Sequence, residues 1–388
     1  MSQILIKDIG LLVTNDPKLG DTQLGLIENA AMLIENGKVS WVGANESAPT
    51  SEKTIDAAGK AVIPGFVDSH NHLIFAADRS AEFSARMSGQ KYSAGGITST
   101  VTQTRAASDS DLLSNANRLV HEGLHSGTTT VEIKSGYGLT VKDEVRSLKI
   151  ASELTEQTTF LGAHVVPVEY KEVADDYVEL VCNQMLTEVR PYAKWIDVFC
   201  DKGAFTTTQA RKILQAGIAA GLKPRLHANQ LEQGDAITLG VELGAASVDH
   251  VSYFNNNDIE KLAGSKTVAT LLPGAEFSTR SVYPDVRKLI QAGVNVAIAS
   301  DCNPGSSYTT NMPFMIALAV REMFFTPEQA LWSATKGGAL ALQLEDVGHL
   351  AVGARADFVI LKESSYIHLA YRPGVNLIDE VWQHGKSI

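Results

Sequence analysis

The stretch "VIPGFVDSHNHLIF" (residues 62–75) begins as an apolar β-strand and ends in polar side chains. Val, Ile and Phe fill its first half, as in a strand that is buried on both faces. Asp68, His70 and His72 then occupy alternate positions. Side chains at i and i+2 of an extended segment point to one face, so the two histidines can direct imidazole nitrogens at one cation. The stretch therefore predicts a buried strand with a metal site at its carboxyl end.

Further β-branched runs follow this strand, and helical patterns such as residues 111–127 and 207–221 separate them. Nearly continuous apolar strands that alternate with helices predict a parallel sheet covered on both faces. Eight such units predict a closed (β/α)8 barrel of the TIM type, which we place at residues 61–345. The predicted strands cover residues 61–70, 128–134, 158–164, 194–200, 223–228, 245–250, 267–273 and 294–300.

Polar residues gather where these strands end. The active sites of such barrels lie at the carboxyl-terminal rim, because the loops that follow the strands meet there. We therefore expect the functional residues on this rim. The polar residues at the strand ends are His70, His72, Lys134, His164, Asp201, His227, His250 and Asp301.

The two ends of the chain carry strand-like patterns of another kind. Residues 1–60 are too few to bury a comfortable core alone, so we pair them with residues 346–388 in one small discontinuous β-sandwich. "ENGK" (residues 35–38) contains an Asn-Gly hairpin signal. Residues 76–108, with Gly95 and Gly96, form the longest irregular stretch and follow the first barrel strand. We expect them to cover the site as a lid.

Composition excludes several classes of protein. The 388 residues carry a formal net charge of −11 and no basic stripe, which disfavours binding to nucleic acid. No apolar run approaches the roughly 20 residues that span a bilayer, so a membrane protein is not expected. The N-terminal residues lack the features of a secretory signal. Cys182, Cys200 and Cys302 are odd in number and widely spaced, which predicts no disulfide framework and favours a cytoplasmic protein.

His227 and Asp301 are the natural residues to complete a metal site with His70 and His72. Imidazole and carboxylate ligands suit Zn or Fe(II), and a catalytic site leaves one position for water. Each residue alone has an ordinary explanation: His227 or His250 as a hydrogen-bonded structural histidine, and Asp301 as a helix cap. Four ligand-type residues on three strand ends of one barrel make metal binding the stronger interpretation.

The opening stretch resembles the first-strand signature of the amidohydrolase superfamily, whose members hydrolyse C–N bonds on this barrel with this metal set. Other segments, over essentially the full chain, resemble the imidazolonepropionase family within it. These segments are "FAADRSAEF" (75–83), "EIKSGYGL" (132–139), "FLGAHVVP" (160–167), "DVFCDKGAF" (197–205), "LLPGAEFS" (271–278) and "ASDCNPGSS" (299–307), with the general superfamily feature "GARADFVIL" (353–361) in the small domain.

The resemblance implies a reaction and a site. The reaction is hydrolysis of the ring amide of 4-imidazolone-5-propanoate to N-formimidoyl-L-glutamate in histidine degradation, by a homodimer with one Zn or Fe ion per chain. The implied metal ligands are His70, His72, His227 and Asp301. The implied substrate contacts are Arg79, Tyr137, His164, Gln230, Asn303, Gly305 and Ser306.

The expected chemistry assigns the proton transfers to Asp301. The metal would lower the pKa of bound water towards about 7, and Asp301 would take the proton and deliver it to the departing ring nitrogen. His250 would stabilise the developing oxyanion, as an imidazole or an imidazolium. Relatives often have Glu at the position of Gln230; an amide can hydrogen-bond the substrate ring, but it cannot act as a base.

Several residues keep an alternative interpretation. Arg79 has the planar fork that suits a carboxylate, but its position alone also fits a solvated charge on the lid. Tyr137 fits packing on a Gly-flanked turn, and His164 fits a structural role equally well. We interpret Lys134 as an ion-pair partner of Glu132 or Asp201 rather than a carbamylated metal bridge.

Other functions fit the same ligands less well. Another single-metal cyclic amidohydrolase or a deaminase would use the same barrel with a different ring. A non-catalytic barrel could keep the metal only for structure, but it would not need the two proton-handling residues Asp301 and His250. The chain lacks the Gly-x-Ser-x-Gly elbow of serine hydrolases, and "SAGGITST" (93–100) is not a phosphate-binding loop.

Overall fold

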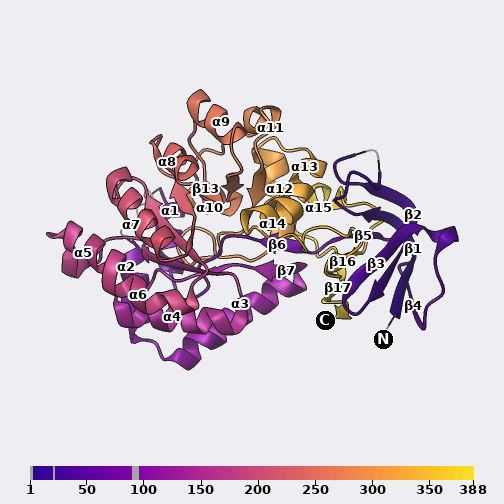
Figure 1. The fold of residues 1–388 in the computed structure, drawn as a ribbon, viewed down its shortest axis with the longest axis horizontal. Coiled ribbons are helices and arrows are strands. Elements are labelled where there is room, and N and C mark those ends of the chain that lie inside the picture. The colour runs from indigo at the N-terminus through magenta and orange to yellow at the C-terminus, as the bar shows by residue number, and fades with distance from the viewer. Residues whose placement is uncertain (1–2, 21, 90–95) are drawn as a thin grey trace. The chain divides into compact units, whose positions relative to one another are not determined.

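The computed structural model describes residues 3–20, 22–89 and 96–388. Contacts divide the chain into two compact units (Figure 1). The first, which we call the sheet unit, comprises residues 1–69, 122–130 and 311–388. The second, the barrel unit, comprises residues 70–121 and 131–310. Each unit is described by itself below.

In the sheet unit, both chain ends contribute to one mixed eight-stranded sheet, as the indigo and yellow strands in Figure 1 show. The hairpin at Asn36 and Gly37 has positive φ at both residues (52° and 77°), as the Asn-Gly signal predicts. The strands are β1 (Gln3–Val13), β2 (Leu26–Glu35), β3 (Lys38–Ala44), β4 (Lys53–Asp56), β5 (Ala61–Pro64), β16 (Phe358–Leu361), β17 (Ile378–Gln383) and β18 (Lys386–Ser387).

This sheet curls over on itself. The Val39 amide donates to the Ala354 carbonyl (2.9 Å), and the Ala356 amide donates to the Gly37 carbonyl (2.8 Å), so the β2–β3 hairpin meets the segment that precedes β16. The enclosed core contains buried side chains of strands from both chain ends, among them Ile6, Met32, Phe358 and Trp382. Neither end of the chain could bury these residues alone.

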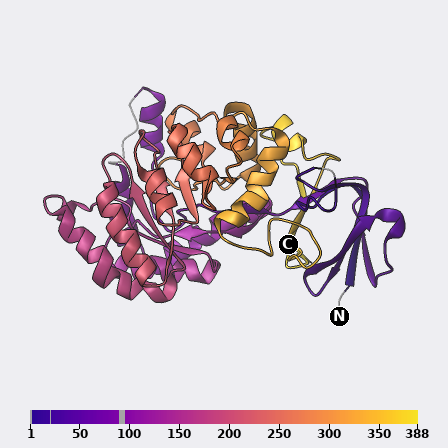
Figure 2. The same ribbon diagram turned by 45° about the horizontal axis from the view of Figure 1, so that its top comes forward.

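In the barrel unit, seven strands lie side by side in chain order, and each pair of neighbours is parallel. Figure 2 shows helices on the outside of these strands. The strands are β8 (Ile133–Lys134), β9 (Thr158–Ala163), β10 (Trp195–Cys200), β12 (Leu226–Ala228), β13 (Ser247–His250), β14 (Val268–Leu271) and β15 (Val296–Ile298), with β11 (Lys223–Pro224) beside β10.

The segment around Asn71 closes the ring of strands. The Lys134 amide donates to the Asn71 carbonyl (2.8 Å) at one side, and Asn71 forms a parallel bridge with Cys302 at the other. The amide of Asp301 also donates to the carbonyl of His70 (3.1 Å). The end of the first barrel strand therefore lies between the second and the eighth. In the sheet unit, β6 (Phe66–Asp68) pairs with β7 (Thr128–Val131).

The helices follow the expected order. The predicted helices at 111–127 and 207–221 are α3 and α7, and α7 begins with a capping box between Thr206 and Gln209. The helices are α1 (Ser80–Met87), α2 (Ile97–Ala106), α3 (Asp109–His125), α4 (Val141–Leu154), α5 (Ala174–Leu180), α6 (Leu186–Val189), α7 (Thr207–Ala219), α8 (Ala236–Glu242), α9 (Asn256–Ala263), α10 (Pro273–Thr279), α11 (Arg287–Gln291), α12 (Met312–Glu322), α13 (Pro327–Trp332), α14 (Gly338–Ala341) and α15 (His368–Tyr371).

The predicted fold class, a (β/α)8 barrel with a small β domain from both chain ends, is confirmed. The predicted boundaries, 1–60 with 346–388 and 61–345, stay a prediction. Within the expected lid at 76–108, the structure has α1 and α2, while Gly95 lies outside the described residues. Among the described residues, every helix is too short or too polar to cross a bilayer.

The curled sheet depends on the stacked pair Phe358 and Trp382, whose ring centroids are 5.2 Å apart and whose side chains are buried. Replacing Phe358 with Ala should lower the free energy of unfolding by about 3–5 kcal/mol, because the sheet cannot fill the cavity. Denaturant titration followed by circular dichroism measures this loss. Val352→Ala, at a side chain 63% exposed in the same unit, is the control. An equal effect of both substitutions would contradict the assignment of this core.

Candidate metal centre

Four side-chain atoms from three strand ends converge in the barrel unit. The Nε2 atom of His72 lies 3.2 Å from that of His70 and 3.4 Å from that of His227. The Oδ1 atom of Asp301 lies 3.6 Å from His70 Nε2 and 3.5 Å from His72 Nε2. A tetrahedral shell with bonds of about 2.0–2.1 Å separates its ligand atoms by about 3.3–3.4 Å. His70, His72 and Asp301 thus lie close enough together to hold one transition-metal ion, and Nε2 of His227 approaches this group at His72.

The protonation of these histidines also suits a metal. His70 Nδ1 lies 2.8 Å from Asp249 Oδ2, and His227 Nδ1 lies 2.9 Å from Asp197 Oδ2. A carboxylate beside Nδ1 keeps the proton there, so the lone pair of Nε2 faces the centre. Burial lowers the pKa of His70 and of His72 well below the usual range, which keeps both rings neutral. Neutral imidazole is the form that binds a metal.

A buried lysine joins the carboxylates behind the histidines. Lys134 Nζ lies 3.0 Å from Asp197 Oδ2, 3.1 Å from Glu132 Oε1 and 4.0 Å from Asp249 Oδ2. Arg225 Nη2 adds a second cation, 3.2 Å from Asp249 Oδ2. Burial alone would raise the pKa of Asp197, but His227 and Lys134 outweigh burial and hold it well below its usual range. The histidines are therefore oriented by ionised carboxylates.

Of the two ion-pair partners predicted for Lys134, the structure has Glu132 but not Asp201. The second close carboxylate is that of Asp197. Asp201 instead accepts hydrogen bonds from the backbone amides of Gln230 (2.6 Å) and Leu231 (2.9 Å), and so holds the loop after β12.

Sequence analysis missed Asp197 and Asp249 as functional residues. A signal was present, because each acid interrupts a buried apolar strand, in "WIDVFC" (195–200) and "SVDH" (247–250). A charge in a buried strand requires a partner. The chain itself does not say which partner, since Asp249 pairs with a histidine 179 residues away.

Most of the implied substrate contacts line one pocket over the four converging atoms. Gly305 is not in its wall but adjoins it, because a Cβ atom added there would lie 2.2 Å from Arg79 Nη1. The pocket is lined by His72, Arg79, Ile97, Tyr137, His164, Phe199, His227, Gln230, His250, Asp301, Asn303 and Ser306.

Tyr137 and His164 are held by buried polar contacts. Glu144 Oε1 accepts hydrogen bonds from the amides of Gly138 (2.9 Å) and Leu139 (2.7 Å), which fixes the loop that carries Tyr137. His164 Nδ1 lies 3.0 Å from the Gly136 carbonyl oxygen. Burial lowers the pKa of His164 to about 3, so the ring is neutral and Nδ1–H donates to this carbonyl. Nε2 is left as a hydrogen-bond acceptor.

The loop after β15 is built around Asn303 and Ser306. Asn303 Oδ1 accepts from the amides of Gly305 and Ser306 (both 2.8 Å), and its Nδ2 donates to the Asp301 carbonyl (2.7 Å). Ser306 Oγ donates to Asp301 Oδ2 (3.3 Å). The loop therefore orients the Asp301 carboxyl group. Both the oxygen and the nitrogen of the Asn303 side-chain amide form hydrogen bonds within this loop.

The ends of β13 and β15 are strained. His250 (φ 76°), Val251 (φ 52°) and Asp301 (φ 52°) adopt the left-handed conformation, which is unfavourable for residues with side chains such as these. Such strain often marks functional positions. A nitrogen of His250 also lies within 4.8 Å of nitrogens of His70 and His227, so His250 is a further metal-capable residue in this group.

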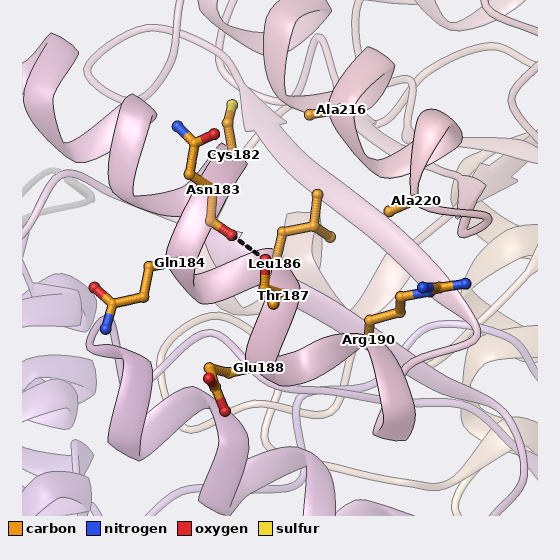
Figure 3. A pocket seen from close by; sticks show the side chains of 9 residues that line it. All are labelled: Cys182, Asn183, Gln184, Leu186, Thr187, Glu188, Arg190, Ala216 and Ala220. Carbon is orange, nitrogen blue, oxygen red and sulfur yellow. Dashed lines mark hydrogen bonds between the residues drawn. The ribbon is translucent and has the colours of Figure 1, made fainter.

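A second, larger pocket of about 650 Å³ lies among residues 182–190 and α7 (Figure 3). Its charged side chains, Glu188 and Arg190, point in different directions, and the hydrogen bond drawn joins Thr187 Oγ1 to the Asn183 carbonyl (2.8 Å). Burial raises the pKa of the Cys182 thiol, which disfavours the reactive thiolate. This pocket lacks the converging polar groups of the site over the histidines.

Comparison with known proteins agrees with this geometry. The amidohydrolase family matches residues 61–386. An imidazolonepropionase of Mycolicibacterium smegmatis is 61% identical over 100% of this chain and 98% of its own. One of Salinispora arenicola is 60% identical over 99% of this chain and 98% of its own. The chain belongs to the imidazolonepropionase family of amidohydrolases.

Solved amidohydrolase-fold structures resemble this imidazolonepropionase-family chain in fold alone. A mutant of atrazine chlorohydrolase of Arthrobacter aurescens, solved with zinc and atraton, superposes with a TM-score of 0.75 at 17% identity, over 99% of this chain and 94% of its own. Guanine deaminase of C. acetobutylicum, solved with guanine, gives a TM-score of 0.74 at 15% identity, over 100% of both chains.

Asp197 provides a test of the carboxylates behind the histidines. Asp197→Asn should weaken metal affinity by about 10–100-fold, because a neutral amide holds the Nδ1 proton of His227 less strongly than a carboxylate and leaves the charge of Lys134 less well compensated. Competition with a chelator measures the affinity. Asp201→Asn, four residues later on the same strand end, should leave metal affinity unchanged. Equal affinities for wild type and Asp197→Asn would contradict the role assigned to this acid.

Proposed function

We propose that this imidazolonepropionase-family chain hydrolyses the ring amide of 4-imidazolone-5-propanoate to N-formimidoyl-L-glutamate, a step of histidine degradation. The names of its full-length relatives support this reaction. The observation that carries it is the presence of Arg79 in the same pocket as His72, His227 and Asp301. A polar ring over those atoms and a carboxylate tail at a guanidinium match the two ends of this substrate.

The site would hold one divalent transition metal, Zn or Fe, through His70, His72, His227 and Asp301. Neutral imidazole nitrogens and one carboxylate suit both ions. The metal would supply a water of lowered pKa, towards about 7, as the nucleophile. The remaining chemistry belongs to the chain's own side chains.

Asp301 is the residue placed to move the proton. Burial raises the pKa of its carboxyl group well above the usual value, whereas a bound cation would lower it. Its Oδ2 accepts from Ser306, and its Oδ1 faces the histidines. Asp301 would take a proton from the attacking water as the new C–O bond forms. It would then return this proton to the ring nitrogen as the C–N bond breaks.

His250 would stabilise the developing oxyanion as a neutral donor. Burial lowers the pKa of His250 well below its usual value, so the imidazole form, and not the imidazolium, is the one available. Donors held in advance in a dry site stabilise an oxyanion without reorganisation. The strained backbone at His250 is consistent with such positioning.

Gln230 and His164 would form hydrogen bonds with the substrate ring. The backbone amide of Gln230 donates to Asp201, which fixes the point of the pocket wall from which the Gln230 side chain extends. His164 offers an acceptor nitrogen to a ring N–H. Because neither residue is a base of suitable pKa, the proton transfers are left to Asp301.

A deaminase is the second candidate, since guanine deaminase shares the fold. Arg79 favours the first candidate, because a purine or pyrimidine ring carries no carboxylate tail. We further propose a homodimer, from the family resemblance, and a cytoplasmic location, from the three widely spaced cysteines.

The proposed function predicts a metal-dependent assay. Purified protein should contain about one transition-metal ion per chain and should consume 4-imidazolone-5-propanoate, followed by its ultraviolet absorbance. A chelator should abolish turnover, and Zn or Fe(II) should restore it. Full turnover by a preparation shown to be free of metal would exclude this chemistry.

Asp301→Asn should lower kcat by about a hundredfold or more, because the amide keeps one coordinating oxygen but cannot carry the proton. Steady-state kinetics and metal analysis of the same sample measure the two effects. His250→Asn should also lower kcat while retaining more metal than His227→Ala. Near-normal turnover by metal-loaded Asp301→Asn would place the base elsewhere.

A further inference from the structure

The guanidinium of Arg79, the residue that precedes α1, is already bound by a carboxylate of that helix. Arg79 Nε donates to Glu82 Oε2 (2.8 Å), and Arg79 Nη2 donates to Glu82 Oε1 (2.6 Å). The Arg79 side chain is 3% exposed and that of Glu82 is 33% exposed. This is the paired two-bond geometry that a guanidinium forms with a carboxylate. A substrate carboxylate therefore meets a guanidinium with two of its three nitrogens in use.

Two glycines enclose this ion pair. A Cβ atom added at Gly96 would lie 1.9 Å from Arg79 Nη2 and 2.5 Å from Glu82 Oε2. A Cβ atom added at Gly305 would lie 2.2 Å from Arg79 Nη1. The chain thus has no side chain at the two places where one would push the guanidinium aside. Nη1 lies beside Gly305, in the loop that contributes Asn303 and Ser306 to the pocket wall.

A second arginine ties the helix to the same loop. Arg86 lies two turns after Arg79 on α1, is buried, and donates from Nη2 to the Gly305 carbonyl (2.7 Å). The loop from Asp301 to Ser306 also orients the proton-transferring carboxyl group. The distance between the end of Arg79 and Asp301 is therefore set by contacts at both ends of one short loop.

We propose that Glu82 is a specificity-determining positioning residue, which binds Nε and one N–H of Nη2 of Arg79 so that the end of the guanidinium with Nη1 is presented to the substrate's carboxylate in one fixed position. This inference rests on the proposed function, which supplies a carboxylate-bearing ring. A donor fixed in one place binds best the ligand whose tail has the matching length between ring and carboxylate. A guanidinium released from Glu82 would swing on its flexible stem and accept tails of several lengths.

The contrary role for Glu82 is competition with the substrate. If Glu82 had to leave the guanidinium before a carboxylate could bind, its removal would tighten binding. If it only stabilised the helix, its removal would weaken every ligand alike. The three roles therefore predict different signs or different patterns, and binding experiments separate them.

The experiment uses the metal-loaded full-length protein and four probes that need no turnover: imidazole-4-acetate, imidazole-4-propanoate, imidazole-4-butanoate and 4-ethylimidazole. Calorimetry measures their affinities for wild type, Glu82→Ala, the nearly isosteric Glu82→Gln and the control Ser84→Ala. Ser84 is exposed on the same helix, so its variant reports general damage to α1.

Wild type should prefer the propanoate over both other acids and over 4-ethylimidazole. Glu82→Ala should weaken propanoate binding about tenfold or more, reduce the preference among tail lengths, and leave 4-ethylimidazole unchanged. Glu82→Gln should fall between, because its amide oxygen still accepts one hydrogen bond. With 4-imidazolone-5-propanoate itself, KM should rise while kcat changes by less than about threefold.

Tighter propanoate binding by Glu82→Ala, unchanged tail selectivity, or equal weakening of 4-ethylimidazole would each overturn the inference. So would a wild type without tail preference. The wild type could show the tail preference, and the Glu82→Ala variant could lose it, while the wild type does not turn over 4-imidazolone-5-propanoate. This result would overturn the proposed function and not this inference.

Discussion

The site depends on charges buried beneath it. Lys134 and Arg225 supply two positive charges to three carboxylates, those of Glu132, Asp197 and Asp249, in the interior of the barrel unit. Ions lose several kcal/mol each when they leave water, and close partners must offset this loss. The excess negative charge faces the histidines, where a divalent cation would be stabilised. The same carboxylates hold the Nδ1 protons of His70 and His227 and turn their Nε2 lone pairs inward.

Residues at the strand ends have strained backbones, which fix the positions of the functional side chains above these charges. His250, Val251 and Asp301 have left-handed backbones, which only surrounding contacts can maintain. Asn303 and Ser306 provide such contacts for Asp301, and Glu144 does the same for the loop of Tyr137. The functional side chains are thus held in place by hydrogen bonds from their neighbours.

Recognition and chemistry share the loop after β15. Asp301 begins this loop, Gly305 lies against Arg79 Nη1, and Arg86 holds the Gly305 carbonyl. A ligand that binds Arg79 is therefore placed relative to Asp301 by a few residues of backbone. A side chain at position 305 would displace the guanidinium, since its Cβ atom would lie 2.2 Å from Arg79 Nη1.

Much of this protein was readable in the chain because the relevant signals are local. His70 and His72 share a face through the two-residue repeat of an extended strand, and helix and strand periods alternate along the barrel. What lies opposite a buried residue is not local. Asp249 contacts His70, which lies 179 positions earlier in the chain. The guanidinium of Arg79 suits a substrate carboxylate by residue type, but in the structure it binds the carboxylate of Glu82. The sequence by itself determined the kind of fold and which residue types could bind a metal. The tertiary structure decided their partners, because a side chain in a dry interior takes its charge state and direction from whatever packs against it.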